Sequence, residues 1–236
     1  MTPENIGPGF SVEHLHAAGG ALAREAARFA SLGWMRGTSG NLSMVVHRDP
    51  LRLAVTASGR DKGELEAHHV VLVDATGAAA EPGSDRPSAE AALHARICSL
   101  TGAGAVVHVH HLDSVVVAER HRAGIEVHGL EMLKGIGRAA HDDAVHFPVI
   151  DNGQDMVELG DRFEVAYDRD TPAVIVARHG LYVWGSDLTQ ARHHTEIVTW
   201  VMEFVAAHPD FAVDSPPESH RHDPIRPFRH REGNLS

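Results

Sequence analysis

The run from residue 105 to 110, Ala-Val-Val-His-Val-His, constrains the fold of this chain more than any other segment. Its small and β-branched residues favour a β-strand, in which successive side chains point to opposite faces. One face therefore carries His108 and His110, with Cα atoms about 6.5 Å apart. Two imidazoles at that separation can bind one metal ion, whereas unpartnered polar rings on a core strand would be costly. The alternative interpretation is two histidines hydrogen-bonded at a strand end.

Helical and strand patterns alternate along most of the chain, and together they predict a single layered α/β domain. Helices are predicted at residues 12–32, 88–100, 111–121, 153–167 and 188–208, and strands at 42–47, 51–57, 70–74, 105–110, 144–150, 173–177 and 181–184. Ser88 and Asp187 are the predicted N-caps of two of these helices. Candidate hairpins favour a mixed or antiparallel central sheet flanked by helices. We assign residues 1–212 to this domain and the polar residues 213–236 to a disordered tail.

The overall charge argues against a nucleic-acid partner. The 236 residues carry a formal net charge of −11 and contain no block of Lys and Arg. An anionic substrate would therefore need a local positive pocket. The single cysteine, Cys98, fits a reducing cytoplasmic compartment, and no signal peptide or apolar run of membrane-spanning length is visible, so no membrane partner is expected.

A catalytic metal site with three protein ligands requires one more residue beside the histidine pair. His179 is the best candidate, because it follows an apolar strand and precedes Gly180, which permits a tight turn and a close approach. His111 should point away from the pair, and His94 lies mid-helix, where a packing or supporting role is expected. Ligation by histidine alone favours Zn²⁺, although Fe²⁺, Mn²⁺ and Co²⁺ accept the same ligand type.

Three segments resemble anion-binding loops. Residues 37–43 and 56–59 are rich in Gly, Ser and Thr, and the second is followed by Arg60 and Lys62. Backbone N–H groups and hydroxyls in such loops bind phosphate without a positive global charge. The helix start at 87–89 offers further N–H groups with a favourable dipole. Each loop alone is more often an ordinary turn, whereas three of them beside a metal site favour anion binding.

Two glutamates are candidates for proton transfer. Glu90 lies in the first turn of the helix predicted to begin near Ser88. Glu131 lies in a largely apolar stretch, residues 129–135, where desolvation could raise its pKa. Either one can instead be a solvated surface glutamate.

The order of these motifs resembles that of the class II aldolase/adducin-head family. The matching segments are GTSGNLS (37–43), TASGRDK (56–62), PSAEAALH (87–94), GAVVHVHH (104–111), LEMLKGI (130–136) and RHGLYVWG (178–185). They span nearly the whole chain apart from its two ends. The resemblance implies a class II aldolase-like catalytic domain with one zinc ion per subunit, in a homotetramer whose active sites lie near subunit interfaces.

The resemblance also implies roles for individual residues. The zinc ligands would be His108, His110 and His179, and the phosphate site would contain Asn41, Ser58, Gly59, Ser88 and Lys62. Glu131 would match the acid/base of the family's dehydratases, whereas Glu90 would match that of its sugar-phosphate aldolases.

Within the family, the motifs are most similar to those of the branch that dehydrates 5-methylthioribulose 1-phosphate in methionine salvage. A zinc-dependent lyase acting on a small phosphorylated ketose is therefore expected. The alternatives are a class II sugar-phosphate aldolase of the fuculose-phosphate type, a related epimerase, or a non-enzymatic structural module like the adducin head. Ala89 stands where the aldolases usually have a second phosphate-binding serine, which favours the dehydratase.

Overall fold

The structure is a computed structural model that describes residues 12–81, 85–138, 143–211 and 213–214. The helices are α1 (Val12–Ser31), α2 (Ala91–Thr101), α3 (Leu112–Arg120), the 3₁₀-helix η1 (Glu131–Ile136), α4 (Met156–Ala166) and α5 (Leu188–Ala207). The described residues contain no helix long and apolar enough to cross a membrane.

A seven-stranded mixed sheet forms the centre of the molecule. Its strand order is β3 (Val70–Asp74), β2 (Leu51–Thr56), β1 (Asn41–Arg48), β4 (Ala105–Val109), β9 (Gly180–Gly185), β8 (Ala173–Val176) and β7 (Val149–Ile150). Every neighbouring pair is antiparallel except β7 and β8, which are parallel. A smaller antiparallel sheet contains β10 (Val213–Asp214), β5 (Ile125–Val127) and β6 (Val145–Phe147).

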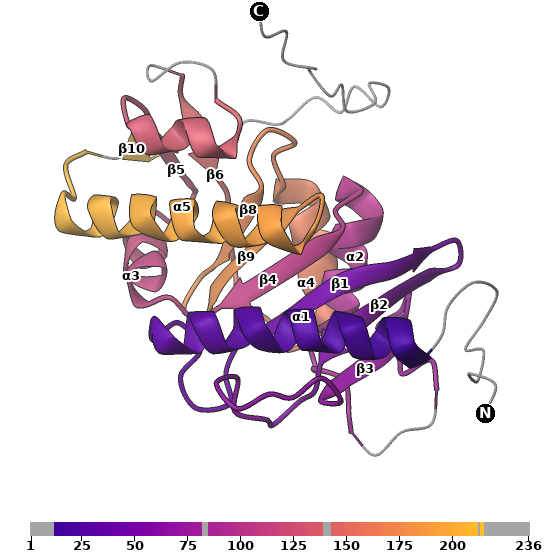
Figure 1. The fold of residues 1–236 in the computed structure, drawn as a ribbon. Coiled ribbons are helices and arrows are strands. Elements are labelled where there is room, and N and C mark those ends of the chain that lie inside the picture. Colours follow the sequence, from indigo (N-terminus) through magenta and orange to yellow (C-terminus); the bar gives the residue numbers. More distant parts are fainter. Residues whose placement is uncertain (1–11, 82–84, 139–142, 212, 215–236) are drawn as a thin grey trace, which may run out of the picture.

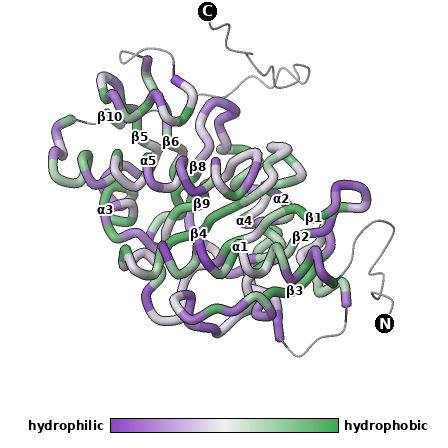
Figure 2. Tube along the Cα trace, viewed as in Figure 1, coloured by the Kyte–Doolittle hydropathy of each residue, from purple (hydrophilic) through white to green (hydrophobic). Residues whose placement is uncertain are grey.

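Helices cover both faces of the large sheet (Figure 1), which confirms the predicted layered α/β fold. One hydrophobic core lies between the sheet and α1, α3 and α5, and includes Val107 and Met202. The other lies between the sheet and α2 and α4, and includes Val106 and Phe163. The alternation of side chains along β4 sends Val106 and Val107 to opposite cores, so this strand is buried on both faces. Figure 2 shows hydrophobic segments gathered on the central strands and hydrophilic segments in the outer loops.

The predicted helix start at Ser88 is wrong. Pro87 pairs with Ala57 in an isolated antiparallel bridge, which keeps this segment extended, and α2 begins only at Ala91. The Ser88 hydroxyl accepts a hydrogen bond from the Glu90 N–H in a local turn instead of capping the helix. Glu90 takes the N-cap position, but its side chain does not cap the helix.

Several other boundaries differ from the prediction by one residue, and the larger differences are these. The strand predicted at 144–150 is divided at Pro148 into β6 and β7, which belong to different sheets. The helix predicted from residue 153 begins at Met156, because the Asp155 carboxylate accepts hydrogen bonds from the N–H groups of Val157 and Glu158. Residues 213–214, assigned above to the tail, pair with β5, and the rest of that assignment, residues 215–236, lies outside the described residues.

Candidate metal centre and active site

His108 lies in the middle of a row of cross-strand partners. It is opposite Asn41 on β1 and opposite Tyr182 on β9, so all three side chains project from the same face of the sheet. The rings of His108 and Tyr182 are stacked, with centroids 4.0 Å apart and an interplanar angle of 16°. His108 Nδ1 lies 3.1 Å from the Leu181 carbonyl oxygen. Because a carbonyl only accepts, Nδ1 carries the proton and Nε2 keeps a lone pair free for a metal.

The structure brings the three predicted ligands together. His108 Nε2 lies 3.0 Å from His110 Nε2, and the ring centroid of His179 lies 4.8 Å from that of each other histidine. One ligand nitrogen from each ring lies within 4.8 Å of the others. Imidazoles converging in this way fit a divalent transition metal, for which histidine nitrogen is a preferred ligand.

His179 reaches the pair from the turn between β8 and β9. Gly180 follows it, and a Cβ atom placed on Gly180 would lie 2.3 Å from the Val109 carbonyl oxygen on β4. Only glycine therefore allows β9 to approach β4 closely at this point, as the sequence predicted. The shared register of the two strands then places His179 beside the end of β4, where His110 follows.

Burial favours the uncharged form of His108 and His110. It lowers the pKa of His108 from 6.5 to about 3, against the attraction of the Glu90 carboxylate, and the neighbouring histidines lower it further. Burial and the adjacent His179 also lower the pKa of His110. A neutral imidazole is the form that binds metal, so the site is prepared for a cation near neutral pH.

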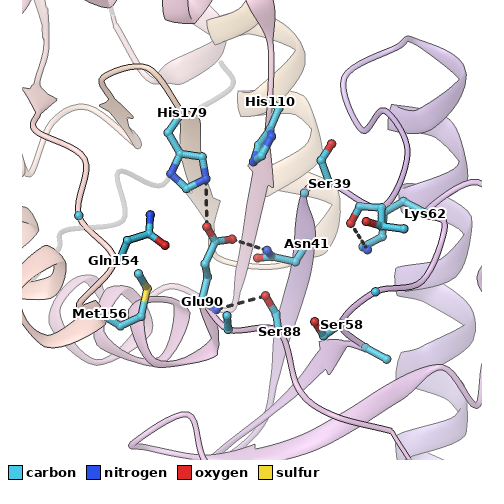
Figure 3. A pocket seen from close by; sticks show the side chains of 16 residues that line it. Ser39, Asn41, Ser58, Lys62, Ser88, Glu90, His110, Gln154, Met156 and His179 are labelled. Carbon is cyan, nitrogen blue, oxygen red and sulfur yellow. Dashed lines mark hydrogen bonds and ion pairs between the residues drawn. The ribbon is translucent and has the colours of Figure 1, made fainter.

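From the start of α2, Glu90 faces the imidazoles of His110 and His179 (Figure 3), and it also lies beside His108. One carboxylate oxygen accepts a 2.5 Å hydrogen bond from Asn41 Nδ2, and the other lies 3.1 Å from His179 Nε2. The first oxygen is also 3.4 Å from His108 Nε2. Burial alone would raise the pKa of Glu90, but His108, His179 and the Asn41 amide together hold it well below its ordinary value. The site thus combines three clustered imidazoles with an ionised carboxylate.

A cavity of about 290 Å³ opens beside these groups. One wall consists of the predicted anion-binding loops, and the lining residues there include Thr38, Ser39, Gly40, Asn41, Ala57, Ser58, Gly59, Lys62, Ser88 and Ala89. The structure therefore brings every residue predicted for the phosphate site to this cavity. Figure 3 shows Ser39, Ser58 and Lys62 on one side of Glu90, and Gln154 and Met156 on the other.

Lys62 supplies a buried cation at the wall formed by the predicted anion-binding loops. Its side chain is only 1% exposed, and Nζ donates to the carbonyl oxygens of Thr38 at 3.0 Å and Arg60 at 2.7 Å. An ammonium group has three N–H donors, so one remains beyond these two bonds. Burial lowers the pKa of Lys62, although Asp61 and Glu90 oppose the shift. This is the local positive charge that an acidic chain needs to bind an anion.

Glu131 lies elsewhere in the single chain. It is the first residue of η1, its side chain is 76% exposed, and it forms an ion pair with Lys134 at 2.7 Å. It is not among the residues that line the cavity in the described part of the chain. Of the two predicted acid/base candidates, only Glu90 is therefore placed next to the histidines by the fold of one chain.

Two other histidines, His94 and His111, are held by residues outside the three-histidine cluster. His94 is fully buried, and its Nδ1 lies 2.7 Å from the Ser43 hydroxyl, while its ring packs edge-on against Tyr182. His111 forms a second group of potential ligands with Asp113 and Glu203. However, His111 Nδ1 accepts a hydrogen bond from the Ser114 N–H, so Nε2 carries the proton that it donates to Glu203 at 3.2 Å. As predicted, His111 is directed away from the histidine pair.

The second wall of the cavity was not predicted from the sequence. Gly153, Gln154 and Met156 line it, but the predicted helix placed these residues inside one regular element. Asp155 was the available signal, since an aspartate followed by apolar residues is a common N-cap and would have moved the helix start to Met156.

A sheet with helices on both faces and a three-histidine cluster at the end of its central strand is consistent with a metal-dependent enzyme of the class II aldolase type. The chain belongs to the class II aldolase and adducin N-terminal domain family, whose model matches residues 20–205. This confirms the resemblance inferred from the motifs.

More specific similarities are found among curated proteins. The chain is 40% identical over 177 residues to a protein of Geobacillus kaustophilus (strain HTA426) named methylthioribulose-1-phosphate dehydratase, and the match covers 74% of this chain and 84% of that relative. A relative of the same name from Sulfurihydrogenibium sp. (strain YO3AOP1) is 36% identical, with 73% and 81% covered. Among solved structures, an L-fuculose 1-phosphate aldolase matches with a TM-score of 0.67 and 20% identity, covering 85% of this chain and 90% of that one. The last match shows the shared fold.

Proposed function

We propose that this protein is a zinc-dependent lyase that dehydrates 5-methylthioribulose 1-phosphate to 2,3-diketo-5-methylthiopentyl 1-phosphate in methionine salvage. The observation that carries the proposal is its 40% identity, over 84% of the relative's length, to a methylthioribulose-1-phosphate dehydratase. One cavity also brings together the histidine cluster, the ionised Glu90 carboxylate and the loops with N–H and hydroxyl donors. This arrangement supports the proposal.

The metal would be held by His108, His110 and His179, and their nitrogen-only donor set favours zinc. When bound, zinc supplies Lewis acidity, which polarises a substrate carbonyl and makes the neighbouring C–H bond more acidic. The Leu181 carbonyl holds the His108 tautomer with its lone pair on Nε2, so this ligand is oriented before a metal arrives.

The phosphate end of the substrate would bind at the wall formed by Ser58, Gly59, Ser88 and Lys62. Gly59 has a φ of +71° and open space around its Cα, so its backbone can come close to an anion. The Lys62 ammonium adds a charge-assisted donor, while Asn41 ties this wall to Glu90. A substrate fixed at its phosphate would extend toward the histidines and Glu90.

The reaction requires removal of the C3 proton and departure of the C4 hydroxyl as water, after which the enol product tautomerises to the diketone. We assign the acid/base role to Glu131, which would protonate the hydroxyl that leaves after it has taken the C3 proton. Because its side chain is 76% exposed and lies outside its own chain's cavity lining, it would act in the cavity of a neighbouring subunit. This proposal includes a homotetramer, and we also place the protein in the cytoplasm.

Glu90 as the acid/base is the alternative, and its position within 3.1 Å of His179 Nε2 favours it. That role would match the family's sugar-phosphate aldolases, in which a carbon–carbon bond breaks instead of a carbon–oxygen bond. Both reactions begin with charge that develops next to a polarised carbonyl, so the same site can serve either one.

A direct assay distinguishes the two reactions. The purified zinc-loaded protein is incubated separately with 5-methylthioribulose 1-phosphate and with L-fuculose 1-phosphate, and the products are analysed by mass spectrometry. We expect only the first substrate to be consumed, with a loss of 18 mass units and no three-carbon fragment. Cleavage of L-fuculose 1-phosphate to a three-carbon phosphate would support the aldolase instead. Inactivity toward both substrates, together with failure to retain zinc after loading, would support a structural module.

A further inference from the structure

The residue before the third histidine has an unusual backbone conformation. Arg178 has a φ of +57°, and it is the one non-glycine residue with a positive φ in the described part of the chain. This left-handed region is unfavourable for residues with a Cβ atom and persists where surrounding contacts hold it. The orientation of His179, the next residue, depends directly on this conformation.

A forked ion pair holds the Arg178 side chain. Its Nε donates to one Glu119 carboxylate oxygen at 2.9 Å, and its Nη2 donates to the other at 2.6 Å. Two parallel hydrogen bonds define the orientation of both groups, unlike a single contact between charges. Glu119 belongs to α3, the helix that begins two residues after His110. The fork therefore connects the turn that carries His179 to the helix that follows the other two histidines.

The same carboxylate extends the connection to the cavity wall. Glu119 also accepts a hydrogen bond from Arg122 Nη1 at 3.3 Å, and Arg122 Nη2 donates to the Asp151 carboxylate. Asp151 follows β7 directly and begins the segment that supplies Gln154 and Met156 to the cavity. An isolated ion pair at such an exposed surface contributes little to stability. A forked pair within a network of four charges contributes more, because its geometry is defined and several charges act together.

We propose that Arg178, Glu119, Arg122 and Asp151 form a surface clamp that positions His179 for metal binding and holds the adjacent cavity wall. These four are positioning residues, because none of them lines the cavity in the described chain. The clamp rests on the proposed metal site. Its loss would let the His179 turn move between more conformations, so that the metal dissociates faster.

The test compares metal release from the full-length wild type with release from Glu119→Gln, Arg178→Gln and the double variant. Zinc transferred to a chromophoric chelator gives the release rate, and the visible spectrum of the cobalt-substituted protein reports ligand geometry. We expect each single variant to release zinc about 10-fold faster, which is the lower end of the effect of losing a partner that orients a ligand. The double variant should resemble the single ones, because both changes break one fork.

Arg96→Gln is the matched control. Arg96 on α2 is 44% exposed and forms a surface ion pair with Glu164 on α4, and neither residue lines the cavity or belongs to the clamp. It should release zinc at the wild-type rate. Arg178→Lys, which keeps the charge and loses the fork, should fall between wild type and Arg178→Gln.

Two outcomes separate this inference from the proposed function. Wild-type release rates and an unchanged cobalt spectrum in Glu119→Gln and Arg178→Gln would overturn the clamp while leaving the metal site intact. A wild-type protein that retains no zinc and gives no cobalt spectrum would instead overturn the proposed metal site itself. Circular dichroism of every variant ensures that release is compared between folded proteins.

Discussion

The phenol ring of Tyr182 stacks on the imidazole ring of His108, although the two residues are far apart in the sequence. They are cross-strand partners on β9 and β4, and both are fully buried. The stack leaves His108 little freedom to turn, while the Leu181 carbonyl holds its Nδ1. Tyr182 therefore orients a candidate metal ligand through packing.

This arrangement predicts different effects for two substitutions of Tyr182. Tyr182→Leu removes the stacked ring and leaves a cavity, so we expect a loss of about 1–3 kcal/mol of unfolding free energy and weaker metal retention. Tyr182→Phe keeps the ring and should retain metal as the wild type does. Urea unfolding of the metal-free proteins and metal analysis of the purified ones provide the two measurements. Equal metal retention in both variants would mean that the stack does not orient His108.

Removal of a histidine ligand should abolish metal binding and activity together. We expect His108→Ala and His179→Ala to weaken zinc binding by at least about 100-fold, beyond the effect of losing a supporting partner. Elemental analysis and turnover of the same preparations test this. Full activity in a metal-free preparation of the wild type would refute the role of the metal.

The two glutamates should respond differently to replacement by glutamine. We expect Glu131→Gln to lower turnover by about 10²–10⁴-fold while zinc and substrate analogues still bind, as is typical of a lost acid/base. Glu90→Gln, unlike Glu131→Gln, should weaken metal retention, because Glu90 contacts both His108 and His179. If Glu131→Gln keeps its turnover and Glu90→Gln is inactive, Glu90 is the acid/base and the aldolase-type mechanism is favoured.

A shared site between subunits predicts complementation. His179→Ala subunits lack a candidate metal ligand but contain Glu131. Glu131→Gln subunits lack the glutamate but contain all three histidines. If Glu131 acts in a neighbour's cavity, subunits exchanged between the two inactive variants should recover part of the activity. Light scattering checks that the mixture has the size of a tetramer. Recovery should be absent when either variant is mixed with itself, and its absence from the exchanged mixture would place Glu131 outside the neighbour's site.

His94 should make the folded protein sensitive to acid. Burial lowers the pKa of this histidine from 6.5 to about 4, so between these pH values the unfolded chain binds a proton that the folded chain does not. The contribution of His94 to the unfolding free energy is fully present above about pH 6.5. It is lost as the pH falls toward 4, and the loss is at most about 3 kcal/mol.

Unfolding of metal-free protein by urea between pH 7 and pH 4 measures this effect. His94→Gln removes the titrating group and can keep the hydrogen bond to Ser43, so its stability should decline less steeply with acid. His68→Gln, which changes a histidine that is 64% exposed, is the control and should follow the wild type. Parallel curves for His94→Gln and the wild type would show that another group causes the acid sensitivity.

Local patterns in the sequence correctly predicted most elements of the sheet and the helices. The strand at 70–74 has the predicted bounds, and the Asp187 cap is confirmed by its hydrogen bond to the Gln190 N–H. These features depend on residues close together in the chain. Ser88 was misassigned because its conformation depends on a bridge between Pro87 and Ala57, which are 30 positions apart, and no local pattern contains that information.

The sequence by itself determined that His108 and His110 share one face of a strand, because side-chain alternation is a property of the strand alone. It also contained the family's ordered motifs, and with them the expected ligands and phosphate loops. Only the tertiary structure decided that Glu90, rather than Glu131, lies against the histidines within one chain. That outcome depends on the position of β4 between β1 and β9 and on the late start of α2, and both are set by packing between segments distant in sequence.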